Sequence, residues 1–402
     1  ERSRAAGVDL GWETSRSLRT SLAFRPQIFT WLQSDFDWST VYQSERNANL
    51  IERTVSGADT TLALSRSVRG QRDWGVDVAL DPGQLALASL GEPAAGEGSG
   101  RARARAVLSA IRPLSVTYRD GITSRFNRDP VDPGLGYQLG WTGTSGFRFV
   151  DADTAAALTD RETWRLGSGL TFAGGAGIQV GYERTVATTL DPRSDRRTLL
   201  RSWPDVRVSL PRIPLPSSLG LQSLDVSSGI VRTQRTIELG GRAAQRRFDE
   251  DLTIPVQVSV QWAASLSTSY QGSFRSGEGV DPTGVTERDE RSHRVSITSR
   301  LLPPGWLARR LDRPVSLTVL GAYTSERACR ATAQGAGCVA FVDQLRRTLN
   351  VSLDTAVQGF SVGLQMSFDD RQSFVGQRTG STQFQVGLFG QLELTGGALP
   401  FG

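Results

Sequence analysis

Residues 256–274 read VQVSVQWAASLSTSYQGSF, an unbroken alternation of apolar or small residues with polar ones. Successive side chains of a β-strand point to opposite sides of the sheet, so the pattern predicts one long, two-faced strand. At about 3.3 Å per residue it would extend roughly 60 Å, whereas a membrane strand needs about 9–11 residues. Such a strand is typical of the wall of a large outer-membrane barrel. A soluble sandwich strand, or two strands joined without a turn, is the alternative interpretation.

The alternation divides the side chains between two expected environments. The apolar set is expected to face lipid and the polar set to face the lumen, and a register slip of one residue would exchange them. The candidate lipid-facing residues are Val256, Val258, Val260, Trp262, Phe360, Val362, Leu364, Phe384, Val386 and Leu388. The candidate lumen-facing residues are Arg101, Arg103, Arg105, Gln257, Ser259, Gln261, Gln365, Gln383 and Gln385.

The composition favours the same architecture. Hydrophobic residues make up 38% of the 402 residues, which is low for a packed globular core but enough for a barrel with one apolar face. The length allows two or three ordinary domains, or one barrel of roughly fourteen to sixteen strands. No stretch approaches the run of about eighteen apolar residues that marks a transmembrane helix. The chain does not begin with Met, and we expect a mature form or a fragment.

Patterns elsewhere raise the expected number of strands to about fifteen. The last eighty residues hold four alternating runs that predict an antiparallel meander, and a Gly-rich turn at residues 173–177 predicts a hairpin. Further strands are predicted at residues 18–24, 60–67, 74–80, 114–118, 135–141, 206–210, 223–236 and 293–301. We therefore expect an all-β fold over residues 1–402, an antiparallel transmembrane β-barrel or part of a barrel wall. Loops or lids are expected at residues 91–100, 211–218, 276–291, 301–314 and 326–340.

Arginine supplies every cationic side chain, because the chain has no Lys. Residues 101–106 read RARARA, which places three guanidinium groups on one face of a predicted strand. In lipid each would cost about 2–4 kcal/mol near the midplane, so we expect them in the lumen or beyond the membrane. A ladder in the lumen would favour anionic substrates, and a solvated strand end is the alternative. The arginines are otherwise scattered among acidic residues, so no nucleic-acid partner is expected.

The two cysteines, Cys329 and Cys338, are predicted to form a disulfide, which fits an oxidising compartment. With one His and no other Cys, a zinc site is nearly excluded. Acidic stretches at residues 151–154 and 249–251 lack the glycine and the downstream glutamate of a calcium loop. Ser292 and His293 suggest a hydrolase, but neighbours in a strand point to opposite faces. We expect neither an enzyme nor a cofactor.

Four stretches carry a resemblance to a known family: residues 202–208 (SWPDVRV), 343–349 (DQLRRTL), 371–376 (RQSFVG) and 380–385 (GSTQFQ). They resemble the C-terminal region of the SprA (Sov) family of giant outer-membrane proteins, which form the translocon of the type IX secretion system. The resemblance implies a protein-conducting pore in the outer membrane of a diderm bacterium. It also implies exported proteins as substrates, and a plug protein and a shuttle-type barrel protein as partners.

The chain is far shorter than members of that family. It is either a C-terminal fragment of a larger barrel, which predicts an open, curved sheet, or a smaller barrel with another function. The alternative functions are a self-contained porin or receptor barrel for small solutes, and a soluble β-rich surface or adhesion module.

Overall fold

The structure is a computed structural model. It describes residues 2–5, 8–12, 14–56, 59–91, 99–126, 133–142, 156–190, 195–213, 220–240, 245–262, 265–301, 305, 311, 314–331, 337–357 and 360–392.

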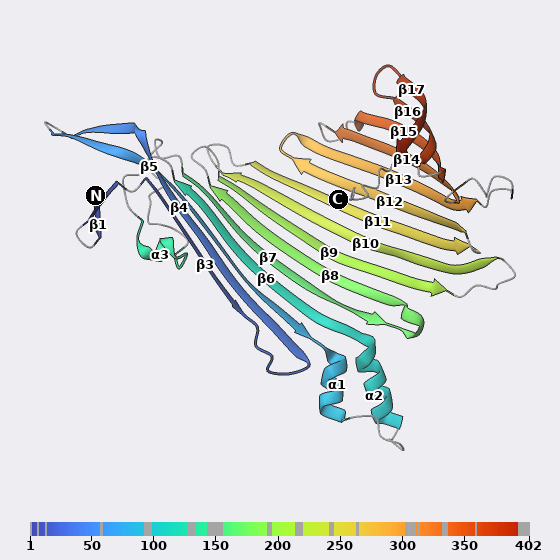
Figure 1. The fold of residues 1–402 in the computed structure, drawn as a ribbon, viewed down its shortest axis with the longest axis horizontal. Coiled ribbons are helices and arrows are strands. Elements are labelled where there is room, and N and C mark those ends of the chain that lie inside the picture. Colours follow the sequence, from blue (N-terminus) through green and yellow to red (C-terminus); the bar gives the residue numbers. More distant parts are fainter. Residues whose placement is uncertain are drawn as a thin grey trace, which may run out of the picture. The chain divides into compact units, whose positions relative to one another are not determined.

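One antiparallel sheet of fifteen strands dominates the fold (Figure 1). Its strands are β3 (Ser15–Phe24), β4 (Leu32–Ser56), β5 (Asp59–Leu80), β6 (Ile111–Phe126), β7 (Ala156–Thr171), β8 (Gly177–Leu190), β9 (Asp195–Ile213), β10 (Leu221–Gly240), β11 (Gln245–Trp262), β12 (Leu266–Asp281), β13 (Gly284–Leu301), β14 (Val315–Ala331), β15 (Val339–Val357), β16 (Phe360–Ser373) and β17 (Thr379–Leu392). β1 (Arg2–Ala5) and β2 (Val8–Trp12) form a separate two-stranded sheet.

The sheet is a meander, because each strand neighbours the strands before and after it in sequence. The predicted all-β fold of about fifteen strands is confirmed. The order ends on β3 and on β17, each with one neighbour, so the described sheet is open. An open sheet was expected for part of a barrel wall, since full closure removes edge strands.

Contacts divide the chain into two compact units. The first unit comprises Glu1–Leu170, Val180–Trp203 and Thr233–Phe248. The second unit comprises Thr171–Gln179, Pro204–Arg232 and Asp249–Gly402. The strands β3–β6 lie within the first unit and the strands β12–β17 within the second, and each set is described below by itself.

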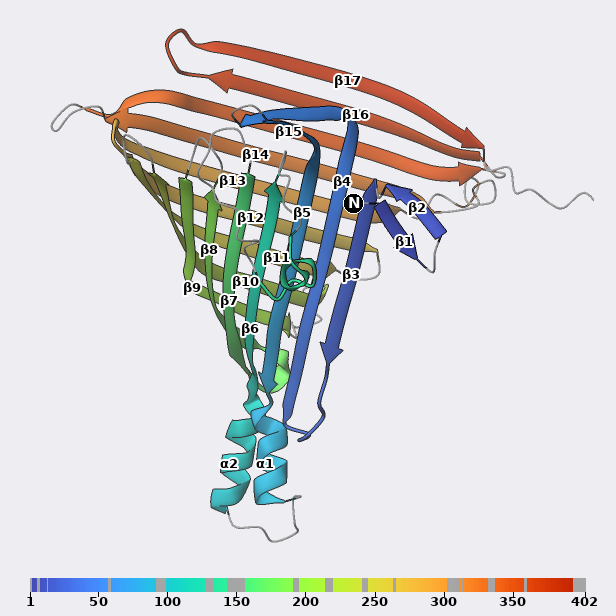
Figure 2. The same cartoon turned by 90° about the vertical axis from the view of Figure 1, so that its left-hand side faces the viewer.

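The helices are few and lie in connections. Helices α1 (Pro82–Leu90) and α2 (Ser99–Ala110) pack side by side between β5 and β6 and extend from the ends of these strands (Figure 2). Asp81 caps α1 by accepting hydrogen bonds from the backbone N–H groups of Gly83 and Gln84. Helix α3 (Leu135–Gln138) lies between β6 and β7, and a short 3₁₀ turn, η1 (Ala173–Gly175), joins β7 to β8.

The prediction of one long strand at residues 256–274 is wrong. The stretch contributes to two strands of a hairpin, because β11 ends at Trp262 and β12 begins at Leu266. The connection lacks the Gly, Pro or Asn that usually marks a turn. It also keeps even-numbered residues on one face, because the indole N–H of Trp262 donates to the Thr268 hydroxyl at 3.0 Å. The polarity pattern therefore passes through the turn unchanged, and periodicity alone could not reveal it.

Two further predicted strands are helices. Arg101, Arg103 and Arg105 lie on α2, so the strand that placed their guanidinium groups on one face does not exist. Alternating Ala and Arg mimics a period of two, but both residues are strong helix formers. The strand predicted at residues 135–141 is wrong as well, because α3 begins at Leu135 and Gly140 follows it with a φ of 74°.

The predicted loops are shorter than expected. Residues 276–291 belong to the hairpin of β12 and β13, in which Ser276–Asp281 pair with Gly284–Asp289. β9 continues through Pro211 to Ile213, while residues 214–219 lie outside the described residues. β14 extends to Ala331 and β15 begins at Val339, which shortens the loop predicted at residues 326–340. Most of residues 91–100 and 301–314 lie outside the described residues, although α2 already begins at Ser99.

Candidate functional site

The register of β3–β7 assigns the side chains of the first unit to two faces, because directly paired residues of antiparallel strands share a face. One of these, the first apolar face, is lined by aliphatic and aromatic side chains. They are Leu22, Phe24, Leu32, Phe36, Trp38, Trp74, Val76, Val78, Leu80, Leu114, Val116, Tyr118, Trp164 and Leu166.

An aromatic row marks one end of this apolar band. Trp74 lies between Phe36 and Tyr118, with ring centroids 6.5 and 4.9 Å away, and Tyr118 lies 4.5 Å from Trp164. Immediately past the row, charged side chains appear on the same face, next to Ile122. There Arg72 pairs with Asp120 at 2.9 Å, and both side chains are largely shielded from solvent. The apolar band is therefore bounded along the strands.

Helix α3 covers the same face farther from the band. Tyr42, Val68, Phe126 and Tyr137 form a buried cluster there. The Tyr137 ring stands perpendicular to that of Tyr42, and its hydroxyl bonds to the Ser124 hydroxyl. A Cβ at Gly70 would lie 2.5 Å from the Tyr137 hydroxyl oxygen, so glycine is needed beneath this ring. Burial raises the pKa of Tyr137 above its ordinary value.

The opposite, polar face of the first unit carries a cluster of one cation and two acids, the Arg119 cluster. The Arg119 guanidinium donates to Asp37 at 2.7 Å and to Asp77 at 2.5 Å. To reach Asp37 on β4, Arg119 of β6 crosses β5 above Gly75. A Cβ at Gly75 would overlap the Arg119 Nη1 atom, so the absence of a side chain makes this crossing possible.

A groove of about 970 Å³ adjoins the Arg119 cluster, lined by Asp35, Asp77 and Asp81 among others. Arg25 pairs with the Oδ2 atom of Asp35 at 2.7 Å. Among the described residues, the Oδ1 atom of Asp35 has no hydrogen-bond partner. This end of the first polar face is therefore acidic.

The register of β12–β17 defines two faces in the second unit in the same way. The second apolar face is lined by Leu266, Tyr270, Phe274, Val295, Ile297, Leu317, Val319, Tyr323, Leu349, Val351, Leu353, Phe360, Val362, Leu364, Met366, Phe368, Phe384, Val386 and Leu388. His293 lies among its aromatic rings, and its Nδ1 atom is 2.8 Å from the Tyr270 hydroxyl. Ser292 lies on the opposite face, so the two residues do not form a catalytic pair.

The candidate residues of the second unit separate as the sequence predicts. Phe360, Val362, Leu364, Phe384, Val386 and Leu388 share the apolar face, and Gln365, Gln383 and Gln385 share the polar face. In β11, Trp262 shares the face of Thr268, which places the alternating Gln257, Ser259 and Gln261 on the other side. Which face meets lipid stays a prediction.

Large apolar side chains on these faces are exposed, with Leu388 at 81% and Phe384 at 66%. The described residues bury only a few hydrophobic side chains: Tyr42, Val68, Ala86, Phe126, Tyr137, Ala328, Cys329 and Ala356. Soluble monomers rarely expose apolar patches larger than a few hundred Å². The apolar faces therefore need a covering that the described part of the chain does not supply.

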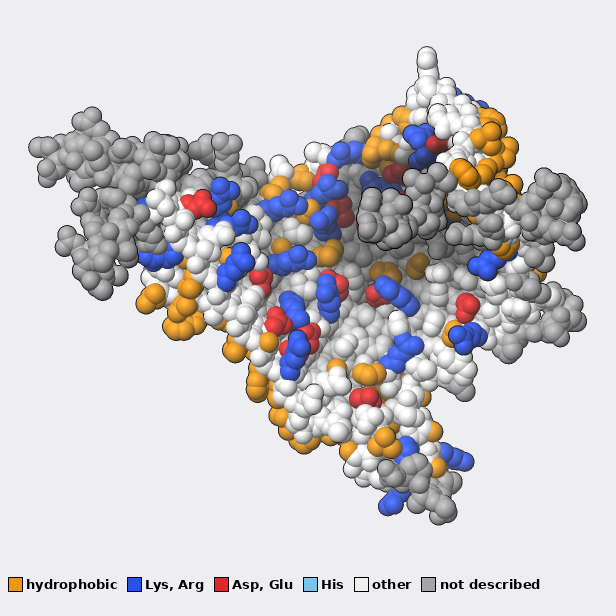
Figure 3. Space-filling view, in the orientation of Figure 1, with side chains coloured by type: hydrophobic (Ala, Val, Ile, Leu, Met, Phe, Trp, Pro, Cys, Tyr) orange, Lys and Arg blue, Asp and Glu red, His pale blue; other side chains and the backbone are white. Residues whose placement is uncertain are grey.

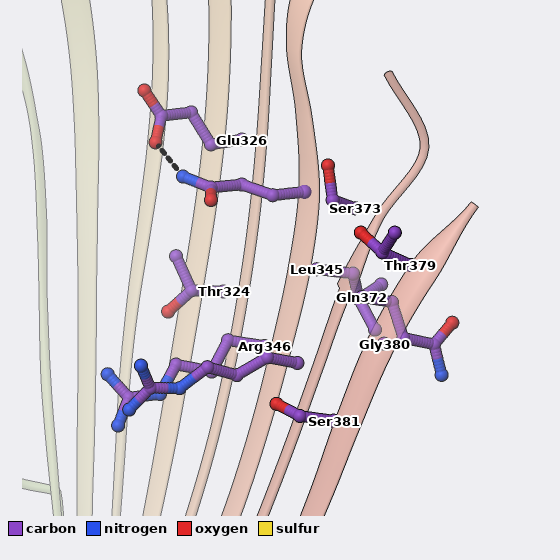
Figure 4. A pocket seen from close by; sticks show the side chains of 11 residues that line it. Thr324, Glu326, Leu345, Arg346, Gln372, Ser373, Thr379, Gly380 and Ser381 are labelled. Carbon is purple, nitrogen blue, oxygen red and sulfur yellow. Dashed lines mark hydrogen bonds between the residues drawn. The ribbon is translucent and has the colours of Figure 1, made fainter. Parts of the chain in front are cut away.

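The polar face of the second unit carries a cluster of one acid and two cations, the Asp369 cluster. Its proportion of charges is the reverse of that in the Arg119 cluster. Arg346 donates to Asp369 through Nη2 at 2.7 Å and Nε at 3.3 Å, and Arg371 does so at 3.1 and 3.2 Å. The two guanidinium groups border a groove of about 570 Å³, in which Arg346 reaches toward the side of Thr324 (Figure 4). Basic and acidic side chains lie beside one another elsewhere on the viewed face too (Figure 3).

The predicted disulfide between Cys329 and Cys338 is confirmed, with an S–S distance of 2.04 Å. Glu287 lies close to both sulfur atoms, but the sulfurs are bonded to each other and are not available as metal ligands. On the polar face nearby, Arg330 donates to both carboxylate oxygens of Asp281 at 2.7 Å. These links join β14 to β12 and to Cys338, the residue that precedes β15, at one end of the second unit.

Neither ion cluster was predicted from the sequence. Asp369 and Arg371 are two residues apart in one strand, a spacing that places both side chains on one face and could have indicated their pairing. The third member, Arg346, and the whole Arg119 cluster depend on the register between strands. Periodicity within a strand carries no information about that register.

Comparison with known proteins found no family model that matches this chain and no curated protein that matches it significantly. Among the described helices, none is long and apolar enough to cross a membrane.

Proposed function

We propose that the sheet forms part of the wall of a wide outer-membrane conduit for polypeptides, related in function to the type IX secretion translocon. The observation that carries the proposal is the bounded apolar band of the first unit. On a single face, the band of aliphatic side chains is followed by the row of Trp74, Tyr118 and Trp164 and then by the Arg72–Asp120 pair, and the apolar side chains farther along, such as Val68, are buried in the cluster with Tyr137 of α3. Bilayer proteins place aromatic girdles between an apolar band and polar extensions in this way.

Strand length supports the same proposal. An outward apolar band is about 25 Å tall, which tilted strands cross in about 9–11 residues. β13 has 18 residues and β5 has 22, so both strands are longer than a bilayer requires. The excess length carries charged residues, as parts that protrude into water would.

The polar faces support a conduit for polypeptides. The residues that line them are mainly Gln, Ser, Thr and paired Arg and Asp, which offer a passing chain hydrogen bonds but few apolar contacts. Such a surface needs no reacting residue. The implied partners are the lipid bilayer, exported proteins, and the plug and shuttle-type barrel proteins suggested by the family resemblance.

Photocross-linking tests this proposal in cells. A photoreactive amino acid at Gln365 or Gln383 should cross-link to exported proteins, and the same amino acid at Val362 or Phe384 should cross-link to lipid. These positions lie in the same two strands, so they form matched controls. Equal protein cross-linking from both faces, or release of the chain by carbonate washing, would contradict the proposal. Cross-links to proteins from neither face, with small-solute permeability retained, would favour a self-contained porin.

A further inference from the structure

The Asp369 cluster has unused hydrogen-bond donors on the polar face. Each guanidinium group binds Asp369 through its Nε and Nη2 atoms. The Nη1 atom of each arginine carries two further N–H donors. Among the described residues, the hydrogen bonds of Arg346 and Arg371 run through Nε and Nη2 alone. Two pairs of donors therefore remain available side by side.

Asp369 itself is fully occupied by the two arginines. It accepts four hydrogen bonds, two at each carboxylate oxygen, which is close to the capacity of a carboxylate. The Asp369 side chain is 25% exposed, whereas those of Arg346 and Arg371 are 52% and 60% exposed. The acid thus holds both cations in position from the sheet side, and the solvent side of the cluster is cationic. Two guanidinium groups and one carboxylate leave a single positive charge.

The surroundings of the cluster fit an extended polypeptide better than a small ion. The groove that Arg346 and Arg371 border is also lined by the hydroxyls of Thr324 and Ser381. A second groove of about 220 Å³ adjoins Arg346 and is lined by Asn350 and Gln385, among other polar side chains. Hydroxyl and amide groups can hydrogen-bond a peptide backbone without selecting its sequence. The first groove is also lined by the acid Glu326, whose carboxylate accepts a hydrogen bond from the Gln344 side-chain amide at 2.8 Å.

We propose that Arg346 and Arg371 form a binding site for a carboxylate carried by an extended polypeptide. Guanidinium groups match the planar geometry of a carboxylate, and charge-assisted hydrogen bonds are the stronger kind. Asp369 pairs with both cations from the sheet side, and its negative charge offsets part of their attraction for the ligand carboxylate. The choice of a polypeptide ligand rests on the proposed conduit, and the carboxylate chemistry rests on the cluster alone.

Peptide binding to the purified full chain in detergent micelles tests this site. The probe is a fluorescein-labelled, amide-capped peptide of four Gly-Ser-Glu repeats, and the control peptide has four Gly-Ser-Gln repeats. Fluorescence anisotropy should show at least tenfold weaker binding of the Gln peptide. Arg346→Gln and Arg371→Gln should each weaken binding of the Glu peptide at least fivefold, and Arg346→Lys should weaken it less.

Asp369→Asn separates a binding site from a structural ion pair. It leaves both cations without their acid, so the Glu peptide should bind severalfold more tightly. Arg330→Gln is the matched control, because it removes an arginine paired with one acid elsewhere on the same polar face and should change binding less than twofold. Equal binding of the two peptides would overturn the site. So would Asp369→Asn if it weakened binding as much as the arginine variants. Either result leaves the conduit itself to the cross-linking experiment, which does not depend on peptide affinity.

Discussion

The Arg119 cluster of the first unit and the Asp369 cluster of the second are built from the same groups in opposite proportion. Arg119 lies between two acids, Asp37 and Asp77, and leaves one negative charge. Asp369 lies between two arginines and leaves one positive charge. Each cluster lies on the polar face of its strands, and the apolar residues lie on the opposite face of the same strands. The comparison teaches that the polar faces are patterned in charge sign as well as in polarity.

The two clusters also differ in how the chain assembles them. Arg119 must cross a strand to reach Asp37, and only Gly75 leaves the space for it. The members of the Asp369 cluster come from two neighbouring strands, β15 and β16, and Arg346 and Arg371 are direct register partners. The Arg119 cluster therefore depends on a glycine, whereas the Asp369 cluster depends only on the register.

Removing Arg119 should have the largest effect on stability. Arg119→Gln would leave Asp37 and Asp77 facing each other without their cation. We expect a loss of roughly 1–2 kcal/mol, because the carboxylates are 46% and 38% exposed and solvent screens part of their repulsion. Urea unfolding in detergent micelles measures this loss. Arg165→Gln, which removes an exposed single pair with Glu183, is the control and should cost less than about 0.5 kcal/mol. Equal losses in the two variants would show that the Arg119 cluster has no special role.

Gly75→Ala breaks the Arg119 cluster without changing a charge. Its methyl group would occupy the place of the Arg119 guanidinium, so the arginine must leave Asp37. We expect a loss of about 1 kcal/mol. In the second unit, a Cβ at Gly321 would meet open space. Gly321→Ala should therefore be neutral or slightly stabilising, since it restricts the unfolded chain. Unfolding curves of the two variants that coincide would remove the proposed role of Gly75.

The charge signs of the clusters should appear in ion selectivity. In planar bilayers, Asp77→Asn should shift the permeability ratio toward anions and Arg346→Gln should shift it toward cations, each by roughly twofold. Arg103→Glu should shift it less, because Arg103 lies on α2 rather than on a strand of the sheet. Shifts of Asp77→Asn and Arg346→Gln in the same direction would contradict opposite local charges. A dominant effect of Arg103 would restore the arginine ladder that the sequence suggested.

Sequence reasoning predicted the features that depend on one strand at a time. Alternation places Val362 and Gln365 on opposite faces whatever their neighbours are, and the Cys329–Cys338 pair needs only a short loop. Sequence reasoning failed where one polarity pattern is compatible with two kinds of secondary structure. Alternating Ala and Arg at residues 101–106 fits a strand and a helix equally well in polarity, and helix propensity decides between them. A turn that preserves the alternation, such as that between β11 and β12, is also invisible to periodicity.

The ion clusters could not have been predicted, for a different reason. They require the register among three strands for Arg119 and between two strands for Arg346, and a slip of one residue would move each partner to the other face. The paired residues lie far apart in the sequence, as Asp37 and Arg119 do, so no local stretch of sequence encodes this register.

The α3 region offers a third case, in which burial rather than charge holds α3 against the sheet. The effect that we expect on changing this contact is the smallest of those described. Burial raises the pKa of the Tyr137 hydroxyl above its ordinary value of 10.0. Since the folded pKa is the higher one, the α3 contact keeps its stability below pH 10 and loses it as the pH rises through the raised pKa. Absorbance at 295 nm should show a late-ionising fraction among the six tyrosines, and Tyr137→Phe should reduce the amplitude of that late step. Added salt should leave the step in place while weakening the Arg119 and Asp369 clusters, because screening acts on exposed charges and not on a buried ring. A late step of unchanged amplitude in Tyr137→Phe would show that α3 does not bury this hydroxyl.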